Sequence, residues 1–116
     1  QAYEDNDMKI RISDYKGKSV VIISGDIDMY SSPDLREQLM VFVGKKTACL
    51  SIDFTMVSYI DSSGIATFVE GLKCMKAYGG RLQFFGIPQG ILEIFRFSKL
   101  DNVFEMYGTI EDAFNS

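Results

Sequence analysis

The residues best placed to support chemistry are three neighbours, Asp61, Ser62 and Ser63, which follow an apolar segment and precede a helical pattern. Backbone N–H groups at a helix start lack intrahelical partners, so they favour an acceptor or an anion. A serine at that point can cap the helix, act as a nucleophile or accept a phosphate. A cap needs only one of the three residues, and the residues alone leave a plain cap and a regulatory phosphate acceptor both open.

The absence of His narrows the possible chemistry, because the chain contains none. A Ser-His-Asp triad, a Cys-His dyad and a His-ligated metal are therefore excluded within the chain. Asp26 and Asp28 supply two carboxylates, which could serve acid–base or metal chemistry. Because no third ligand or His accompanies them, we favour the interpretation that they are turn residues. Cys49 and Cys74 show no metal-site spacing and are expected to be buried free thiols.

Length and charge limit the classes of partner. The 116 residues suffice for one domain with a real core. A net charge of −4 and a pI near 4.7 argue against nucleic acid. No apolar run approaches the roughly 20 residues that span a bilayer, so direct membrane insertion is not expected. Residues 1–7 are expected to be a disordered tail or a cloning remnant, and residues 8–116 a cytoplasmic domain.

The elements that must position these residues alternate after an opening hairpin. Periodicity and turn residues predict strands over Lys9–Asp14, Ser19–Ser24, Thr47–Phe54, Arg81–Phe85 and Val103–Met106. The same signals predict four helices. The first is capped by Ser32 and the second runs from Ser63 or Gly64 to Tyr78. The other two cover Ile91–Phe97 and Thr109–Phe114. Strand–helix–strand units place their strands parallel. We therefore predict an α/β domain with a mixed sheet of four or five strands and helices packed mainly on one face.

The connections between strands and helices carry apolar as well as acidic residues. Gly25–Ser31 is predicted to be a loop, with Pro33 opening the helix that follows Ser32. Because such connections gather at one end of the sheet, apolar residues there can form a binding patch or simply cover the core. We favour the patch, whose members would be Met29, Tyr30, Met56, Tyr59 and Ile87.

Two motifs at a defined distance resemble those of a known family. Gly25-Asp26-Ile27-Asp28 precedes a Ser-rich helix start, and Ile60-Asp61-Ser62-Ser63-Gly64 follows an apolar strand. Together with the element order and Gly79-Gly80, this pattern resembles a SpoIIAA-like STAS domain of the bacterial anti-sigma-factor antagonists. The resemblance covers Met8 to about Phe114. Gly64-Ile65-Ala66 departs mildly from the Gly-Leu-Gly that is usual in the family, which could alter how closely a partner approaches.

The resemblance implies a non-enzymatic switch in the control of transcription. The unphosphorylated form would bind an anti-sigma factor with serine kinase activity and so free the sigma factor. Phosphorylation would end that binding, and a serine phosphatase of the PP2C type would restore it. ATP belongs to the kinase, so the chain itself would need no cofactor.

The resemblance also assigns residues to these roles. Ser62 corresponds to the phosphorylated serine, and Asp28 and Asp61 correspond to the acidic residues near it. The partner-binding surface would comprise Asp26, Asp28, Met29, Tyr30, Ser31, Asp61, Ser62, Ser63, Gly64 and Ile87. We expect Ser63 to be the helix cap, Asp28 to be an exposed loop residue whose loss costs little stability, and helix-terminal N–H groups to stabilise a phosphate on Ser62.

Two other functional classes remain open from the sequence. One is a STAS scaffold subunit of a membrane transport or lipid-trafficking ATPase complex, which needs no phosphorylation. The other is an enzyme that uses Ser62 as a nucleophile, which the missing His disfavours.

Overall fold

The fold is known from a computed structural model, which describes residues 7–116. A five-stranded mixed sheet has the order β1-β2-β3-β4-β5. The strands are β1 (Lys9–Tyr15), β2 (Lys18–Ile27), β3 (Cys49–Ile60), β4 (Arg81–Phe85) and β5 (Glu105–Tyr107). β1 pairs antiparallel with β2, and every later neighbour pairs in parallel. The predicted hairpin, parallel crossovers and α/β class are therefore confirmed. The predicted tail over residues 1–7 lies outside the described residues except for Asp7.

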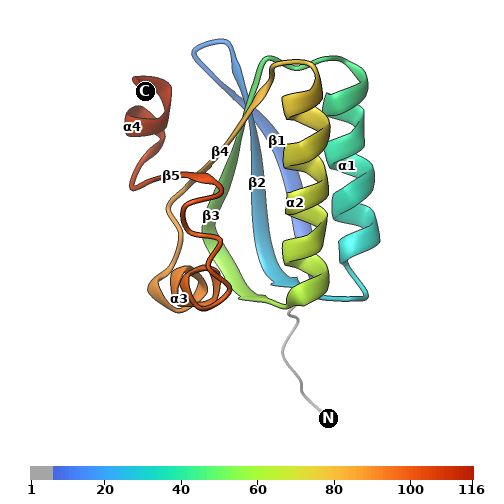
Figure 1. Cartoon of the computed structure of the whole chain (residues 1–116), viewed down its shortest axis with the longest axis vertical. Coiled ribbons are helices and arrows are strands. Elements are labelled where there is room, and N and C mark those ends of the chain that lie inside the picture. The colour runs from blue at the N-terminus through green and yellow to red at the C-terminus, as the bar shows by residue number, and fades with distance from the viewer. Residues whose placement is uncertain (1–6) are drawn as a thin grey trace.

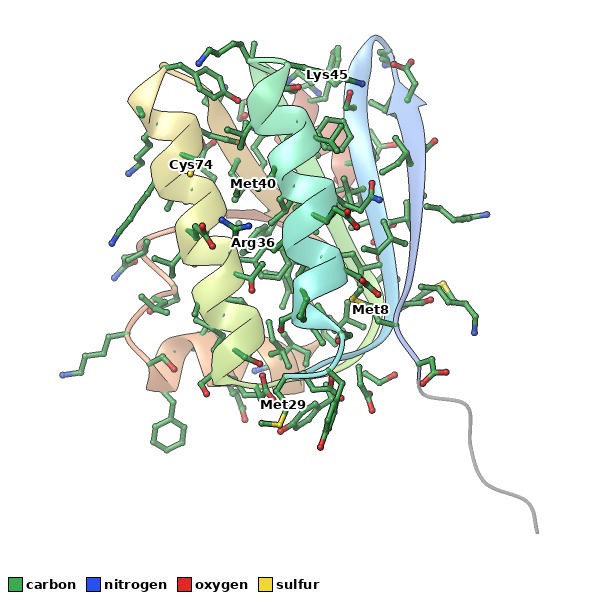
Figure 2. The ribbon with its side chains drawn as sticks, turned by 90° about the vertical axis from the view of Figure 1, so that its right-hand side faces the viewer. Met8, Met29, Arg36, Met40, Lys45 and Cys74 are labelled. Carbon is green, nitrogen blue, oxygen red and sulfur yellow. The ribbon has the colours of Figure 1, made fainter. Side chains whose placement is uncertain are left out.

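The helices lie mainly on one face of the sheet, as predicted. α1 (Ser32–Gly44) and α2 (Ser62–Ala77) run side by side there (Figures 1 and 2). The guanidinium of Arg36 joins them by donating to both carboxylate oxygens of Glu70, at 2.8 and 2.7 Å. α4 (Ile110–Phe114) lies on the opposite face, where Gln83 Nε2 donates to the carbonyl of Ala113 at 3.0 Å (Figure 1).

An aromatic cluster forms the centre of the core and holds α3 (Gln89–Phe97) against the sheet. Phe54 of β3 packs on Phe68 of α2 and on Phe84 of β4, with ring centroids 5.3 and 4.7 Å apart. Phe95 of α3 joins the same cluster at 5.8 Å from Phe84. Burial of such rings contributes favourably to folding. The packing of Phe95 in this cluster also holds α3 beside the carboxyl end of β3 (Figure 1).

β2 and β3 are both longer than the sequence predicts. Gly25–Ile27, predicted as loop, continues β2, and β3 runs to Ile60 instead of ending at Phe54. The register shifts between Ile22 and Ser24 and again between Gly25 and Asp26, because β3 places an extra residue opposite β2 at each point. Buried positions on β3 therefore recur every third residue, at Phe54, Val57 and Ile60, so the usual alternation of a strand is lost.

The remaining elements are all present, but α3 begins at Gln89, two residues before the predicted start, and β5 begins at Glu105, two residues after it. β4 has the predicted bounds, and Thr109 caps α4 by accepting from the Asp112 N–H at 3.1 Å. Cys49 and Cys74 are free thiols as predicted, although both are half-buried. Within residues 7–116, none of the helices is long and apolar enough to cross a membrane.

Close packing at Gly64 fixes where α2 begins relative to the ends of β2 and β3. A Cβ on Gly64 would lie 2.7 Å from Ile27 Cγ2 and 2.8 Å from Ile60 Cγ1. Real Cβ atoms do not approach neighbours so closely, so a side chain there would push the helix start away from both strands. The glycine is thus required by the close approach and not by its own backbone conformation.

Gly64→Ala is accordingly expected to lower the free energy of unfolding by about 1–3 kcal/mol, because Ile27 and Ile60 must shift to admit the methyl group. Gly44→Ala is the matched control, since a Cβ there meets nothing within 4 Å and should leave stability unchanged or raise it by up to ~1 kcal/mol. Urea unfolding of both variants measures the difference. Equal stabilities would contradict the close approach at Gly64.

Candidate functional site

Two strand-to-helix connections meet at one end of the sheet and form the candidate site. β2 and β3 are parallel with Ile27 opposite Ile60, so the chain leaves both strands at the same edge. The Asp61 N–H donates to the carbonyl of Ile27 at 3.1 Å. Ser63 Oγ lies 3.3 Å from Ser32 Oγ at the start of α1. The parallel pairing therefore brings the Asp26–Ser31 segment beside Asp61–Gly64.

Asp61 caps α2, so the prediction that Ser63 is the cap was wrong. Asp61 has extended backbone, and its Oδ1 accepts from the N–H groups of Ser63 and Gly64 at 2.9 and 3.2 Å. Ser63 is the second residue of the helix, and its hydroxyl donates to the same Oδ1 at 2.6 Å. A carboxylate in the cap position accepts the hydrogen bonds of the helix-terminal N–H groups in preference to a hydroxyl that lies within the first turn.

The pKa of the Asp61 carboxyl lies below its usual value. Burial is the largest single influence and acts to raise the pKa, but the hydrogen bonds from the Ser63 hydroxyl and the Gly64 and Ser63 amides together outweigh it. The Met29 backbone lowers the pKa further. Asp61 is therefore ionised at neutral pH and keeps a negative charge beside Ser62.

Ser62 is the first residue of α2, and its side chain differs from that of Ser63 in two ways. Ser62 is exposed, whereas Ser63 is half-buried. Within residues 7–116 the Ser62 hydroxyl makes no hydrogen bond, whereas the Ser63 hydroxyl is held by Asp61. Of the two hydroxyls, only that of Ser62 is both accessible and uncommitted.

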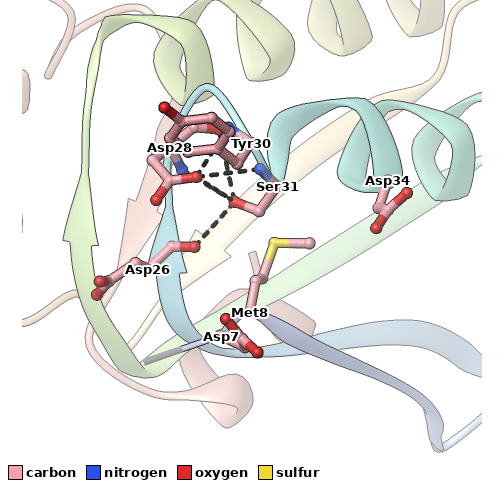
Figure 3. A pocket seen from close by; sticks show the side chains of 7 residues that line it. All are labelled: Asp7, Met8, Asp26, Asp28, Tyr30, Ser31 and Asp34. Carbon is pink, nitrogen blue, oxygen red and sulfur yellow. Dashed lines mark hydrogen bonds between the residues drawn. The ribbon is translucent and has the colours of Figure 1, made fainter. Parts of the chain in front are cut away.

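Asp28 organises the connection between β2 and α1. Its Oδ1 accepts from the N–H groups of Tyr30 and Ser31 at 2.9 and 3.0 Å (Figure 3). The Asp28 N–H in turn donates to Ser31 Oγ at 2.9 Å, and that hydroxyl donates to the carbonyl of Asp26 at 2.9 Å. Asp28 is half-buried, so the expectation of an exposed residue was wrong, and the turn-forming interpretation is confirmed for it.

The start of α1 also differs from the prediction by one residue. Ser31 occupies the cap position and Ser32 is already helical, which places Pro33 second in the helix. Ser32 is buried, and its hydroxyl donates to the carbonyl of Asp28 at 2.6 Å. The sequence predicts no role for Ser32 beyond capping. The two consecutive serines before Pro33 could have indicated that one caps the helix and the other makes a separate hydrogen bond. The buried Ser32 ties the first connection to the second through its contact with Ser63.

A hollow of about 540 Å³ opens beside this turn (Figure 3). Its lining consists of Asp7, Met8, Asp26, Asp28, Tyr30, Ser31 and Asp34. The Asp26 carboxylate makes no hydrogen bond or ion pair with any described residue. Four carboxylates give the hollow a negative potential, although within residues 7–116 no three His, Cys, Asp or Glu side chains are grouped so as to hold a metal ion.

The predicted apolar residues do not all lie together. Met29 and Tyr30 project from the first connection with 62% and 86% of their surfaces exposed. Met56 and Tyr59, near the end of β3, are also exposed. Ile87 instead packs against the core and lines a separate hollow with Gly86, Leu92, Met106, Tyr107 and Gly108. Gly64 is buried, so its part in the site is to allow the close approach of α2.

Comparison with known proteins assigns this fold and site to a class. The STAS domain family model matches residues 9–113, and the chain belongs to the STAS family. It is 36% identical over 86 residues to the anti-sigma-B factor antagonist of Bacillus subtilis, an alignment that covers 74% of this chain and 78% of that protein. Within the STAS family, the chain therefore groups with the anti-sigma-factor antagonists.

Solved structures agree with the fold. An anti-sigma factor antagonist from Mycobacterium paratuberculosis superposes with a TM-score of 0.86 at 24% identity, covering 98% of this chain and 97% of that one. SpoIIAA in its unphosphorylated form gives a TM-score of 0.78 at 18% identity over 92% of this chain and 94% of its own. The Bacillus cell fate determinant SpoIIAA in its phosphorylated form gives 0.70 at 18% identity over 92% and 97%. At these identities the likeness concerns the fold alone.

Asp28→Ala is expected to lower the free energy of unfolding by about 1 kcal/mol, because two backbone amides lose their acceptor. Asp26→Ala is the matched control, since its carboxylate has no partner among the described residues, and it should change stability by no more than ~0.5 kcal/mol. Both values come from urea unfolding at neutral pH. If the two variants are equally stable, Asp28 does not hold the turn.

Proposed function

We propose that this chain is an anti-sigma-factor antagonist that is switched by phosphorylation of Ser62. In the unphosphorylated state it binds an anti-sigma factor with serine kinase activity, and a sigma factor is thereby released. The proposal rests on one observation above all, the exposed and uncommitted Ser62 hydroxyl at the start of α2. The chain's relatives are named anti-sigma-B factor antagonists, which supports the same role.

The position of Ser62 supports a role as phosphate acceptor over the alternative at Ser63. A kinase must reach the hydroxyl oxygen and remove its proton. Ser63 Oγ is half-buried and already donates that proton to Asp61 at 2.6 Å. Phosphorylation of Ser63 would therefore cost the hydrogen bond that holds the helix cap, whereas phosphorylation of Ser62 leaves the cap intact.

The charge around Ser62 supports the direction of the switch. A phosphoserine adds between about 1.5 and 2 negative charges at neutral pH. Asp61 is ionised beside Ser62, and Asp26 and Asp28 line the neighbouring hollow. A further negative charge on this surface raises repulsion and the cost of desolvation at an interface. A loss of roughly 3 kcal/mol would weaken binding about a hundredfold.

The remaining parts of the proposal concern the partners. Asp26, Asp28, Met29, Tyr30 and Ser31 would form one side of the binding surface, and Asp61–Ser63 the other. A PP2C-type serine phosphatase would remove the phosphate and restore binding. We further propose that the protein acts in the cytoplasm as a regulator without catalytic activity of its own.

Ser62→Ala is expected to abolish phosphorylation by the cognate anti-sigma factor and ATP, whereas Ser63→Ala should still be phosphorylated at Ser62. Peptide mass spectrometry of the reaction products locates the phosphate. The unfolding curve of each variant provides the control, because loss of the Ser63 hydroxyl should reduce stability and loss of the Ser62 hydroxyl should not. Phosphate on Ser63 alone, or incorporation into Ser62→Ala, would refute the assignment.

Ser62→Asp should bind the anti-sigma factor at least tenfold more weakly than Ser62→Ala, which should itself bind no more than about fivefold more weakly than the unmodified chain. A hydroxyl contributes about 1 kcal/mol, whereas an added charge at a desolvated contact costs several. Titration calorimetry with the purified partner gives both dissociation constants. Equal affinities would mean that charge at Ser62 is not the signal.

A further inference from the structure

The surface around Ser62 is too small to form a stable interface alone. Standard interfaces take about 20–30 residues from each side. The two connections at the site, Asp26–Ser31 and Asp61–Gly64, supply ten positions, and two of them, Ile27 and Gly64, are buried. A partner that covers Ser62 must therefore continue over neighbouring elements, either across α1 or across the end of β3 towards α3.

The surface on the β3 side is an apolar groove. It has a volume of about 400 Å³ and is lined by Val57, Ser58, Tyr59, Pro88, Gly90, Ile91 and Ile94. None of these side chains is charged. Val57 and Ile91 are buried at 4% exposure, whereas Tyr59 exposes 48% of its surface. The groove lies at the end of the sheet where α2 begins, because α3 sits beside the carboxyl end of β3 (Figure 1).

Tyr59 connects the groove to the site. It stands opposite Asp26 in the pairing of β2 with β3, and it precedes Asp61 by two residues. Met56, three residues before Tyr59 on β3, is 63% exposed. Tyr59 therefore brings exposed apolar surface of the groove to within three residues of Ser62 in the chain.

The α1 side offers a different surface. The shallow hollow there is lined by Pro33, Asp34, Arg36, Glu37, Met40 and Val41, and three of these six side chains are charged. Arg36 also donates two hydrogen bonds to Glu70. Desolvating these charges would oppose binding, whereas covering the groove would remove apolar surface from water.

We propose that the groove between the end of β3 and α3 is a second part of the partner-binding surface and takes an apolar segment of the same anti-sigma factor that contacts Ser62. The inference rests on the proposed function, because it assigns the groove to that partner. The occupant is apolar because the lining has no charged side chain that could pair with a charged residue of the partner. The partner thus meets a carboxylate-rich surface on one side of Ser62 and an apolar groove on the other.

Gly90→Glu tests the groove without disturbing the fold. A Cβ on Gly90 meets nothing within 4 Å, and an acidic residue in the first turn of α3 suits the helix dipole. The new carboxylate would stand at the wall of the groove. The control is Gly44→Glu, where the same side chain enters open space at the end of α1. Tyr59→Ser is a second variant that removes an exposed wall of the groove instead of blocking it.

Calorimetric titration with the purified anti-sigma factor that phosphorylates the chain is run on the unmodified protein, these three variants and Ser62→Asp. We expect Gly90→Glu and Tyr59→Ser to weaken binding at least tenfold, and Gly44→Glu to stay within twofold of the unmodified chain. Unfolding curves verify that each variant is folded.

Failure of the inference can be told apart from failure of the proposed function. If the unmodified chain binds and Ser62→Asp does not, while Gly90→Glu and Tyr59→Ser bind normally, the groove is outside the interface and the inference is overturned alone. If the unmodified chain shows no binding, both are overturned. Equal weakening by Gly90→Glu and Gly44→Glu would also overturn the inference, because the effect would then be one of charge anywhere on the surface.

Discussion

The parallel pairing of β2 with β3 up to Ile27 and Ile60 is the constraint on which the site depends. Parallel strands that end in register deliver their connections to the same edge of the sheet, so two segments distant in the sequence meet there. Two contacts result directly from this meeting of the connections. The Asp61 N–H donates to the Ile27 carbonyl, and the Ser63 hydroxyl contacts that of Ser32. Gly64 completes the arrangement, because any side chain there would push the start of α2 away from both strands.

The three polar residues at the start of α2 divide their tasks. Asp61 satisfies the helix-terminal amides, and Ser63 adds a hydrogen bond to the same carboxylate. Ser62 is left exposed, and its hydroxyl has no partner among residues 7–116. The apparent redundancy of Asp-Ser-Ser in the sequence is thus resolved by geometry. A structural cap and a free hydroxyl coexist within one helical turn because they are carried by different residues.

The sequence alone predicted much of this fold, and its failures have physical causes. Element order, the hairpin and the parallel crossovers follow from periodicity and glycine-containing turns, so these were predicted correctly. The ends of β2 and β3 were missed because the register shifts replace alternation by a three-residue pattern at Phe54, Val57 and Ile60.

The details of the site were harder to predict. The sequence could not choose between Asp61 and Ser63 as the cap, since both residue types cap helices well and only the backbone conformation decides. It also could not separate Ile87 from the site, because pairing order does not tell which way a connection carries its side chains.

The cap at Asp61 has a consequence for how a phosphate on Ser62 would be held. Its carboxylate already occupies the N–H groups of Ser63 and Gly64, and the Ile65 N–H is bonded to the Asp61 carbonyl. The helix start therefore has few donors left to offer a phosphate, contrary to the expectation from the sequence. A phosphoryl group there would be held by water more than by its own chain. Adding or removing such a group would then break no hydrogen bond of the helix cap, so kinase and phosphatase alike would act on a solvated position beside an intact helix start.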